Sequence, residues 1–174
     1  MPAGTTCDLF GVTVTGSVIV QPGAIFGAFN STIDGSVLFN GSGGVSGLCG
    51  STVKGGVTVE NLTSNHSVTL GSDEAPRFGF TCSGDHIAGP VTVTNNAGQV
   101  EIVGSTVYLA GNSGTGVDSS DGSVGIEGDT FHSNLICFGN NPAPANDDPT
   151  TMPNTVQGQA VGQCAALGAS APTG

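Results

Sequence analysis

Charged side chains are scarce in this sequence, and basic ones are almost absent. Only 9% of the residues are charged, and Lys and Arg total 2 against 13 acidic residues, for a formal charge of −11. Nucleic-acid binding draws its affinity from cations that neutralise phosphate, so this composition argues against it. Attraction to an anionic membrane surface is excluded on the same ground. No apolar run approaches the roughly 18 residues of a membrane-spanning helix, so membrane insertion is not expected.

Aromatic residues are also few, and no segment has the periodicity of a helix. There is no Trp and only one Tyr, whereas Gly accounts for 30 of the 174 residues. The glycines follow no period of three, so they are expected in turns and not in a collagen-like helix. Hydrophobic residues make up 37%, which is more than a disordered chain contains. The composition predicts a β-rich domain whose polar surface consists of hydroxyl and amide groups.

An eight-residue unit, T-V-x-G-x-V-x-V, recurs along the chain. Copies start at Thr13, Thr32, Thr52 and His86, and weaker copies start at Thr106 and Thr130. The apolar residue after each start falls at positions 14, 33, 53, 87, 107 and 131, so the steps are 19, 20, 34, 20 and 24 residues. A repeat of about 20 residues is too short to bury its own apolar face and must stack on its neighbours.

Within each repeat, apolar residues alternate with small polar ones, which is the period of a β-strand. The pattern predicts an all-β, right-handed parallel β-helix, with three short strands in each coil of about 20 residues and 6–7 coils. Right-handed crossovers dominate parallel connections, and this fixes the expected hand. Three inward columns are expected: Val14, Ile33, Val53, Ile87 and Val107; Val18/Val20, Val37/Phe39, Val57/Val59 and Val91/Val93; and Val68/Leu70, Val100/Ile102 and Val124/Ile126.

The long step of 34 residues and the end of the chain depart from the repeat. The extra residues of the long step are placed in an insert around Ser72 to Phe80. Residues 1–137 are expected to form the β-helix, and residues 138–174 an extended tail pinned to the last coil. Within the tail, the segments around Thr155 and Val161 are expected to lie along that coil. The recurring Gly16, Gly35, Gly55 and Gly89 mark the bend between the first two strands, where a positive φ or the lack of a side chain is needed.

The repeat and the closing segment resemble a group of uncharacterised secreted bacterial proteins that are predicted right-handed β-helices. That group repeats T-V-x-G-[SGN]-V-x-V and closes with a strand ending in Cys, an Asn-Pro-Ala-Pro stretch and a final Gly-Gln-Cys. Here the closing pattern comprises Cys137, residues 141–144 and residues 162–164. The resemblance covers most of residues 7–167. It implies the fold and an extracellular or cell-surface location, and it carries no activity.

Five cysteines in such a chain favour an oxidising compartment. Cys49 and Cys82 precede the anchors of adjacent coils by nearly the same offset, and stacked positions lie roughly 4.8 Å apart, within disulfide range. We therefore predict Cys49–Cys82, and Cys137–Cys164 to pin the tail. Cys7 is then left unpaired and is a candidate for an intermolecular disulfide.

No catalytic or cofactor site is predicted. Glycoside hydrolysis needs two carboxylates on either side of a sugar, and only the pairs Asp85/Glu101 and Glu127/Asp129 offer one. Such pairs arise by chance in an acidic solenoid, so we expect no enzyme. His66, His86 and His132 lie in different registers and are expected on the surface.

A weak calcium candidate and four sequons complete the possible sites. Carboxylates that could hold Ca²⁺ are Asp118, Asp121 and Glu127, although their spacing matches neither the EF-hand loop nor the RTX repeat, and a polar turn is the favoured interpretation. The sequons begin at Asn30, Asn40, Asn61 and Asn65, and would carry surface sugars if the source glycosylates Asn.

Three functions are compatible with these features. The sequence favours a non-catalytic extracellular structural protein, possibly a subunit that assembles with itself end to end into a filament, sheath or surface layer. The alternatives are a module that binds carbohydrate or an ice surface and a minimal polysaccharide-active enzyme. A column of Thr13, Thr32, Thr52 and Thr106 supports the ice alternative. The neighbouring column of Thr15, Asp34, Lys54, Ala88 and Tyr108 opposes it, because it is not a regular Thr array.

Overall fold

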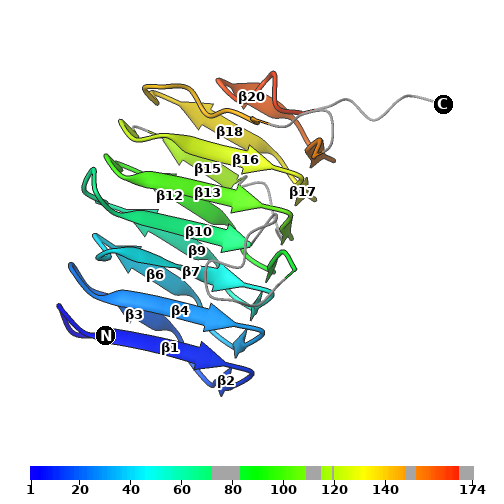
Figure 1. Cartoon of the computed structure of the whole chain (residues 1–174). Helices are drawn as coiled ribbons and strands as arrows, with labels where there is room; N and C mark the ends of the chain where they lie inside the picture. Colours follow the sequence, from blue (N-terminus) through cyan, green and yellow to red (C-terminus); the bar gives the residue numbers. More distant parts are fainter. Residues whose placement is uncertain (72–82, 109–114, 119, 148–151, 169–174) are drawn as a thin grey trace.

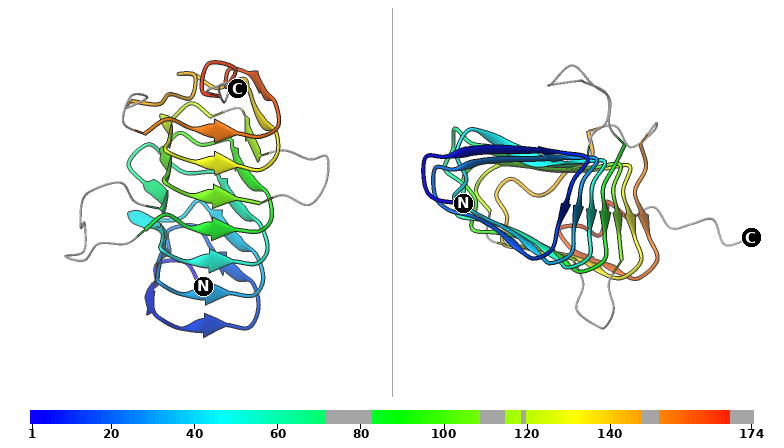
Figure 2. Two further views of the ribbon diagram at one scale, coloured as in Figure 1. Left: turned by 90° about the vertical axis from the view of Figure 1, so that its right-hand side faces the viewer. Right: turned by 90° about the horizontal axis from the view of Figure 1, so that it is seen from below.

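The computed structural model is a parallel β-solenoid without a described helix, built from three sheets that wrap one apolar interior (Figure 1). It describes residues 1–71, 83–108, 115–118, 120–147 and 152–168. Viewed from the N-terminal end, in the right-hand panel of Figure 2, the chain runs clockwise as it recedes, so the solenoid is right-handed. The cross-section in that view is an elongated triangle. The predicted fold class is therefore confirmed.

Sheet A contains six parallel strands with five or four residues each. Its inward residues alternate with outward ones along each strand, as a period of two requires. In stacking order the strands are β1 (Thr6–Phe10), β4 (Ile25–Phe29), β7 (Val45–Cys49), β10 (Ser67–Gly71), β13 (Gln99–Val103) and β16 (Val124–Glu127).

Sheet B contains seven two-residue strands, six from the copies of the repeat start and one from Thr155–Val156 near the end of the chain. Its register pairs each Thr or His with the next along the stack, and each anchor with the next anchor. The strands are β2 (Thr13–Val14), β5 (Thr32–Ile33), β8 (Thr52–Val53), β11 (His86–Ile87), β14 (Thr106–Val107), β17 (Thr130–Phe131) and β19 (Thr155–Val156).

Sheet C also has seven strands and closes the triangle. The last strands of sheets B and C, β19 and β20, come from the segment that the sequence assigns to the tail, so that segment adds a seventh level to these two sheets. The strands of sheet C are β3 (Val18–Val20), β6 (Val37–Asn40), β9 (Val57–Glu60), β12 (Val91–Thr94), β15 (Thr115–Asp118), β18 (Leu135–Phe138) and β20 (Ala160–Gly162).

The turns are slightly longer than predicted, at about 22 residues. The connections from β10 to β11 and from β14 to β15 contain the extra residues. Sheet A strands normally lead into sheet B after two residues, as between Cys49 and Thr52. Between Gly71 at the end of β10 and His86 at the start of β11, the connection is 14 residues long. The extra residues of the long step are thus in the predicted connection. The insert itself, Ser72 to Phe80, lies outside the described residues.

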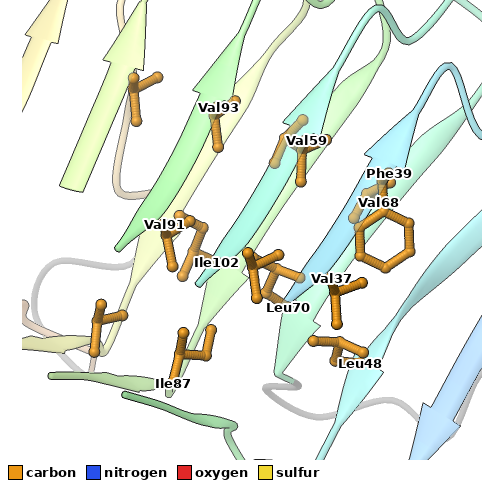
Figure 3. Packing of buried hydrophobic residues seen from close by; sticks show 14 of the residues in the cluster. Val37, Phe39, Leu48, Val59, Val68, Leu70, Ile87, Val91, Val93 and Ile102 are labelled. Atoms are coloured by element: carbon orange, nitrogen blue, oxygen red, sulfur yellow. The ribbon is translucent and has the colours of Figure 1, made fainter. Parts of the chain in front are cut away.

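The interior is a continuous apolar stack. Val37, Val59 and Leu70 are no more than 1% exposed, and Figure 3 shows side chains of sheet C facing those of sheets A and B across the interior. All three predicted inward columns lie in the predicted registers, because each anchor pairs with the anchor of the next coil. Each fully buried Val or Ile contributes roughly 1.5–3 kcal/mol relative to an exposed one.

The recurring glycine of the bend is needed for close approach and not for a left-handed backbone. A Cβ at Gly35 would lie 2.6 Å from the backbone N of Ser17 and 2.7 Å from the backbone C of Gly16 in the coil below. Neither Gly35 nor Gly55 has a positive φ. Of the two reasons that the sequence offered, the lack of a side chain is therefore the one that applies here.

Candidate functional site

The outer face of sheet B carries a column of hydroxyl groups in register along the whole solenoid. His86 replaces a Thr at one level, as the repeat predicts. The side chains of this column are exposed or half-buried. The column consists of Thr13, Thr32, Thr52, His86, Thr106, Thr130 and Thr155.

The neighbouring column on the same face is chemically irregular. Lys54 Nζ forms a salt bridge of 2.7 Å with Asp34 Oδ1 of the coil below, and both side chains are substantially exposed. Two coils above Lys54 the column contains the ring of Tyr108, and Ala88 lies between them. A flat, repeating Thr-x-Thr surface of the kind that orders ice is therefore not present on this face.

Three rings stack along sheet B. Tyr108 and His132 have centroids 4.4 Å apart at an interplanar angle of 10°, and His86 lies 6.5 Å from Tyr108 at 17°. His132 Nδ1 lies 3.0 Å from Gln157 Oε1, which fixes the orientation of its ring. Tyr108 is 44% exposed. The His residues are on the outside, as predicted, but two of them meet the single Tyr, which their separate registers did not indicate.

Behind sheet B, at the corner where sheet A ends, polar side chains form a buried ladder. Each accepts a hydrogen bond, 2.7 to 3.2 Å long, from the backbone N–H at the same position in the coil below. The N–H of Val12 is the lowest donor. The accepting side chains are Ser31, Ser51, Asp85, Ser105, Asp129 and Asn154.

The two carboxyl groups of this ladder are perturbed. Burial raises the pKa of Asp85 from 3.8 to about 7, although the backbone N–H groups of Ser51 and Gly71 oppose the shift. Burial likewise raises the pKa of Asp129 well above 3.8, and the charges of Glu127 and Asp85 add to the effect. Asp85 Oδ2 is buried and has no hydrogen-bond partner among the described residues. Sequence reasoning treated both as ordinary acids, although a polar residue directly before each Thr was a detectable signal.

The ladder contains one member of each carboxylate pair that the sequence offered for glycoside hydrolysis. Asp85 and Asp129 are each 1% exposed and point into the corner, whereas Glu101 lies on the outer face of sheet A, where it accepts a hydrogen bond from Thr69 Oγ1. A sugar cannot lie between a buried carboxyl and a surface carboxyl on opposite sides of a sheet. Neither pair therefore has the accessible geometry of a glycosidase.

The calcium candidates lie along one stretch of chain but not at one point. Asp121 precedes β16 and Glu127 ends it, so the strand separates them, while Asp118 ends β15. Glu127 Oε1 accepts a hydrogen bond from the backbone N–H of Asp147. Among the described residues there is no group of three His, Cys, Asp or Glu side chains that could hold a metal ion.

One of the two predicted disulfides has both of its cysteines among the described residues. Cys137 and Cys164 are bonded, with Cα atoms 5.3 Å apart, which confirms the predicted pairing of these two residues. Cys49 is also in a disulfide, and its predicted partner, Cys82, lies outside the described residues. Cys7 is a free, half-buried thiol on β1 of the first coil.

The four sequons differ in accessibility. Asn30, Asn61 and Asn65 are exposed, and Asn40 is half-buried. The Asn61 amide donates to Asn40 Oδ1 at 3.0 Å and accepts from the amide of Asn95 at 2.7 Å. Asn61 thus belongs to an amide chain along the corner after sheet C. The hydroxyl residue of the Asn40 sequon, Ser42, is fully buried, which makes that sequon the least accessible of the four.

The two ends of the solenoid are not equivalent. Leu9, Val14 and Val18 of the first coil point inward but are only partly buried, whereas their counterparts in the second coil, Ala28, Ile33 and Val37, are no more than 1% exposed. Among the described residues, three of the six exposed large apolar side chains also belong to the first coil: Phe10, Val12 and Ile19.

The other end is covered by the tail. Ala145 bridges to Gly125 of β16, and Cys164 is fully buried beneath the closing turn. Leu167, which follows in that turn, packs partly against the core.

Comparison with known proteins adds no relative: no family model, curated protein or solved structure matches this chain. Within the described part of the chain, no helix is long and apolar enough to cross a membrane. The function must therefore be argued from the geometry alone.

Proposed function

We propose that this protein is a non-catalytic, extracellular structural protein whose solenoids stack end to end, as subunits of a filament, sheath or surface layer. The observation that carries the proposal is the open first coil. Its inward side chains, among them Leu9, Val14 and Val18, occupy core positions but keep part of their surface in water. Another coil stacked beneath them would bury that surface, and each large apolar side chain so covered would contribute up to about 1.5–3 kcal/mol.

The opposite end offers strands of matching direction. In the described chain, β19 and β20 are the last strands of sheets B and C, and β2 and β3 are the first. Because all strands of a sheet are parallel, the top of one copy presents the edge that would continue the bottom of another, and unpaired edges template such pairing. At the bottom of sheet C, Met1 donates to Ile19 O and accepts from Gln21 N, so a second copy would have to displace Met1 to continue that sheet. Val156 and Leu167, near the top, are also only partly buried. A head-to-tail contact of this type repeats into a fibre.

Two further features oppose stacking but do not prevent it. Ala145 covers the top of sheet A through its bridge to Gly125, so a second copy would continue sheets B and C and meet the tail over sheet A. The charge of −11 repels like chains, but at physiological ionic strength this repulsion is screened beyond roughly 8 Å.

The extracellular location is part of the same proposal. Disulfides form and persist in oxidising compartments. This chain has one between Cys137 and Cys164 and a second that includes Cys49, which supports an extracellular location. Membership of the secreted bacterial β-helix group that the closing segment resembles would give the same location.

The test is to measure the association state of the purified protein, by light scattering across a concentration series and by negative-stain electron microscopy. Wild type is expected to form linear particles that lengthen with concentration. Val18→Asp, at the open end, is expected to remain folded and monomeric. Val45→Asp is the matched control, because Val45 is an exposed apolar residue on a side face, 46% accessible. A wild-type protein that stays monomeric at every concentration would overturn the proposal, and a closed dimer joined through two first coils would overturn the filament.

A further inference from the structure

We propose that a cleft at the corner between sheets C and A binds the ammonium group of a lysine side chain from a basic partner protein. The cleft has a volume of about 250 Å³. It lies among the loops that run from sheet C to sheet A, on the left-hand side of Figure 1, and it includes no residue of the first coil. The site is therefore independent of end-to-end stacking. Its lining residues are Asn61, Leu62, Asn95, Asn96, Ala97 and Asp121.

The cleft lies where two stacked loops differ in length. Residues 61–66 join β9 to β10, whereas the loop above them, between β12 and β13, contains only residues 95–98. The two loops are fixed to each other, because Ala97 N donates to Leu62 O at 2.8 Å. This backbone contact holds the walls of the cleft in place before a ligand binds, so little further ordering is needed on binding.

The side-chain amides at this corner form an aligned chain. Asn95 Nδ2 donates to Asn61 Oδ1 at 2.7 Å, and Asn61 Nδ2 donates to Asn40 Oδ1 at 3.0 Å. Hydrogen bonds in such a chain polarise one another, so the oxygen at its upper end, Asn95 Oδ1, is a stronger acceptor than that of an isolated amide. Among the described residues, Asn95 Oδ1 has no hydrogen-bond donor of its own.

A carboxylate from the next coil completes the set of acceptors. The backbone N–H of Asp121 donates to Asn96 O at 2.7 Å, which fixes Asp121 at the edge of the cleft. Its side chain is exposed and, within the described part of the chain, forms neither a hydrogen bond nor an ion pair. The two carboxylate oxygens and Asn95 Oδ1 provide an acceptor for each of the N–H donors of an ammonium group.

These acceptors suit an ammonium group on an aliphatic stem better than a metal ion. Ca²⁺ takes roughly six to eight oxygen ligands, which this cleft does not provide. No group of three His, Cys, Asp or Glu side chains that could hold a metal is found among the described residues. The lining also includes Leu62 and Ala97, which give the methylene groups of a lysine stem an apolar contact.

The lysine must come from another protein. Lys54, the only Lys of this chain, is already in a salt bridge with Asp34. The charge of −11 attracts basic partners and repels acidic ones. Glu60, which ends β9 directly before Asn61, adds to the negative potential at this corner.

The test is a titration with Nα-acetyl-lysine-methylamide, followed by ¹H–¹⁵N NMR of the full chain below the concentration at which light scattering detects particles. The side-chain amide signals of Asn61 and Asn95 and the backbone amide signal of Asp121 are expected to shift together and to saturate in the millimolar range. The norleucine analogue has the same stem without the ammonium group and is expected to cause no shift. The Nε-trimethyl-lysine analogue keeps the charge but has no N–H donor, and it is expected to bind at least about tenfold more weakly.

Matched variants separate the site from general charge effects. Asp121→Asn is expected to abolish the saturable shift, whereas Asp8→Asn, which removes the same charge from an exposed position on β1, is expected to leave it unchanged. Asn95→Gly removes the amide and tolerates the φ of 55°, and it is expected to weaken binding at least about tenfold. Its control is Asn30→Gly, because Asn30 is also exposed and has a φ of 48°.

Three results would overturn the site: no saturable shift with the lysine analogue, equal binding of the trimethyl-lysine analogue, or unchanged binding by Asp121→Asn. Glucosamine and calcium chloride are titrated separately. Tighter binding of glucosamine would overturn the lysine side chain as the ligand, and saturation of the same signals at lower concentrations of calcium would overturn the ammonium group. Val18→Asp, the variant designed to block stacking, is expected to bind the lysine analogue as wild type does, so loss of stacking and loss of lysine binding are separate outcomes.

Discussion

The first and last coils are built from the same repeat but differ in how their interiors are closed. At the C-terminal end, Cys164 lies under the closing turn and is bonded to Cys137, and both are fully buried. At the N-terminal end, Val14 and Val18 occupy equivalent inward positions but remain partly accessible. In a solenoid, how much an inward Val contributes to the free energy of unfolding therefore depends on its level in the stack as much as on its position in the repeat.

The two halves also differ in the chemistry of the buried ladder. The lower coils use the hydroxyls of Ser31 and Ser51 as acceptors, whereas the upper coils use the carboxyls of Asp85 and Asp129 at two of their levels. A hydroxyl is neutral at every pH, but a buried carboxyl is stable in the interior only when it holds a proton. The upper half should consequently respond to pH, and the lower half should not.

The largest effect is expected from the same substitution at two levels of one column. Val53→Asp places a carboxyl in the closed interior. The free energy of burying that carboxyl is a large part of the roughly 5–15 kcal/mol by which domains are stable, so this variant is expected not to fold. Val14→Asp, in the first coil, should keep a wild-type circular-dichroism spectrum because its carboxyl reaches water. Equal unfolding of both variants would show that the first coil is closed in solution.

The second effect is a loss of stability as the pH rises. An Asp with a raised folded-state pKa is penalised when it ionises. Stability is therefore complete below the unfolded value of 3.8, falls as the pH rises from there towards 7, and is constant above it. For Asp85 the loss is about 4 kcal/mol. Asp85→Asn, which keeps the acceptor oxygen, should reduce the fall in urea-denaturation stability between pH 4 and pH 8 and raise the stability at pH 8.

Asn154 is the natural precedent for this variant, because its amide accepts from Asp129 N and also donates to Ile126 O within the same ladder. Asp129→Asn should act in the same direction as Asp85→Asn. Ser51→Ala serves as the control in the lower half, since it removes a ladder acceptor that does not titrate. Its stability cost should be the same at both pH values, and a pH slope that survives in Asp85→Asn/Asp129→Asn would disprove the explanation.

A smaller loss is expected from opening the closed end. The Cys137–Cys164 disulfide encloses a sequence separation of 27 residues, for which chain-entropy arguments give about 3–4 kcal/mol. Cys137→Ser/Cys164→Ser should lower the free energy of unfolding by that order. Hydrogen exchange should become faster in β18 and β20 and stay unchanged in β3 and β6. A uniform increase across all coils would mean that the disulfide stabilises the whole solenoid and not its upper end.

The smallest effect distinguishes the ends through one methyl group. A Cβ at Gly35 would meet the coil below at 2.6 Å, whereas one at Gly16, at the same position of the first coil, would meet nothing within 4 Å. Gly35→Ala should therefore destabilise by about 1–3 kcal/mol, and Gly16→Ala should stay within about 0.5 kcal/mol of wild type. Thermal unfolding of the two variants side by side is sufficient to measure this difference.

Most of the architecture could be predicted because the repeat places one apolar anchor at a fixed offset from each Thr. The steps from Val14 to Ile33 and Val53 gave the register of sheet B, and the outsized step to Ile87 located the insert. The Cys137–Cys164 pairing followed from the position of the tail.

The ladder was missed for a physical reason. Alternation separates apolar from polar residues, and a polar residue is normally assigned to the outside. At this solenoid corner the backbone N–H of the coil below must donate to a polar side chain of the coil above, so Asp85 and Asp129 lie inside. The stack of Tyr108 on His132 was missed because register places two residues in one column without fixing the direction of their rings.

The ladder also has a direction, since each side chain serves the coil that precedes it in the sequence. The N–H of Ser31 finds its acceptor only when Ser51 has been added above it, and the N–H of Ser105 only when Asp129 has arrived. A solenoid that stopped one coil short would therefore leave a buried corner donor unsatisfied, in addition to the unpaired groups of its strand edges. Asn154 completes the series at the top of the ladder.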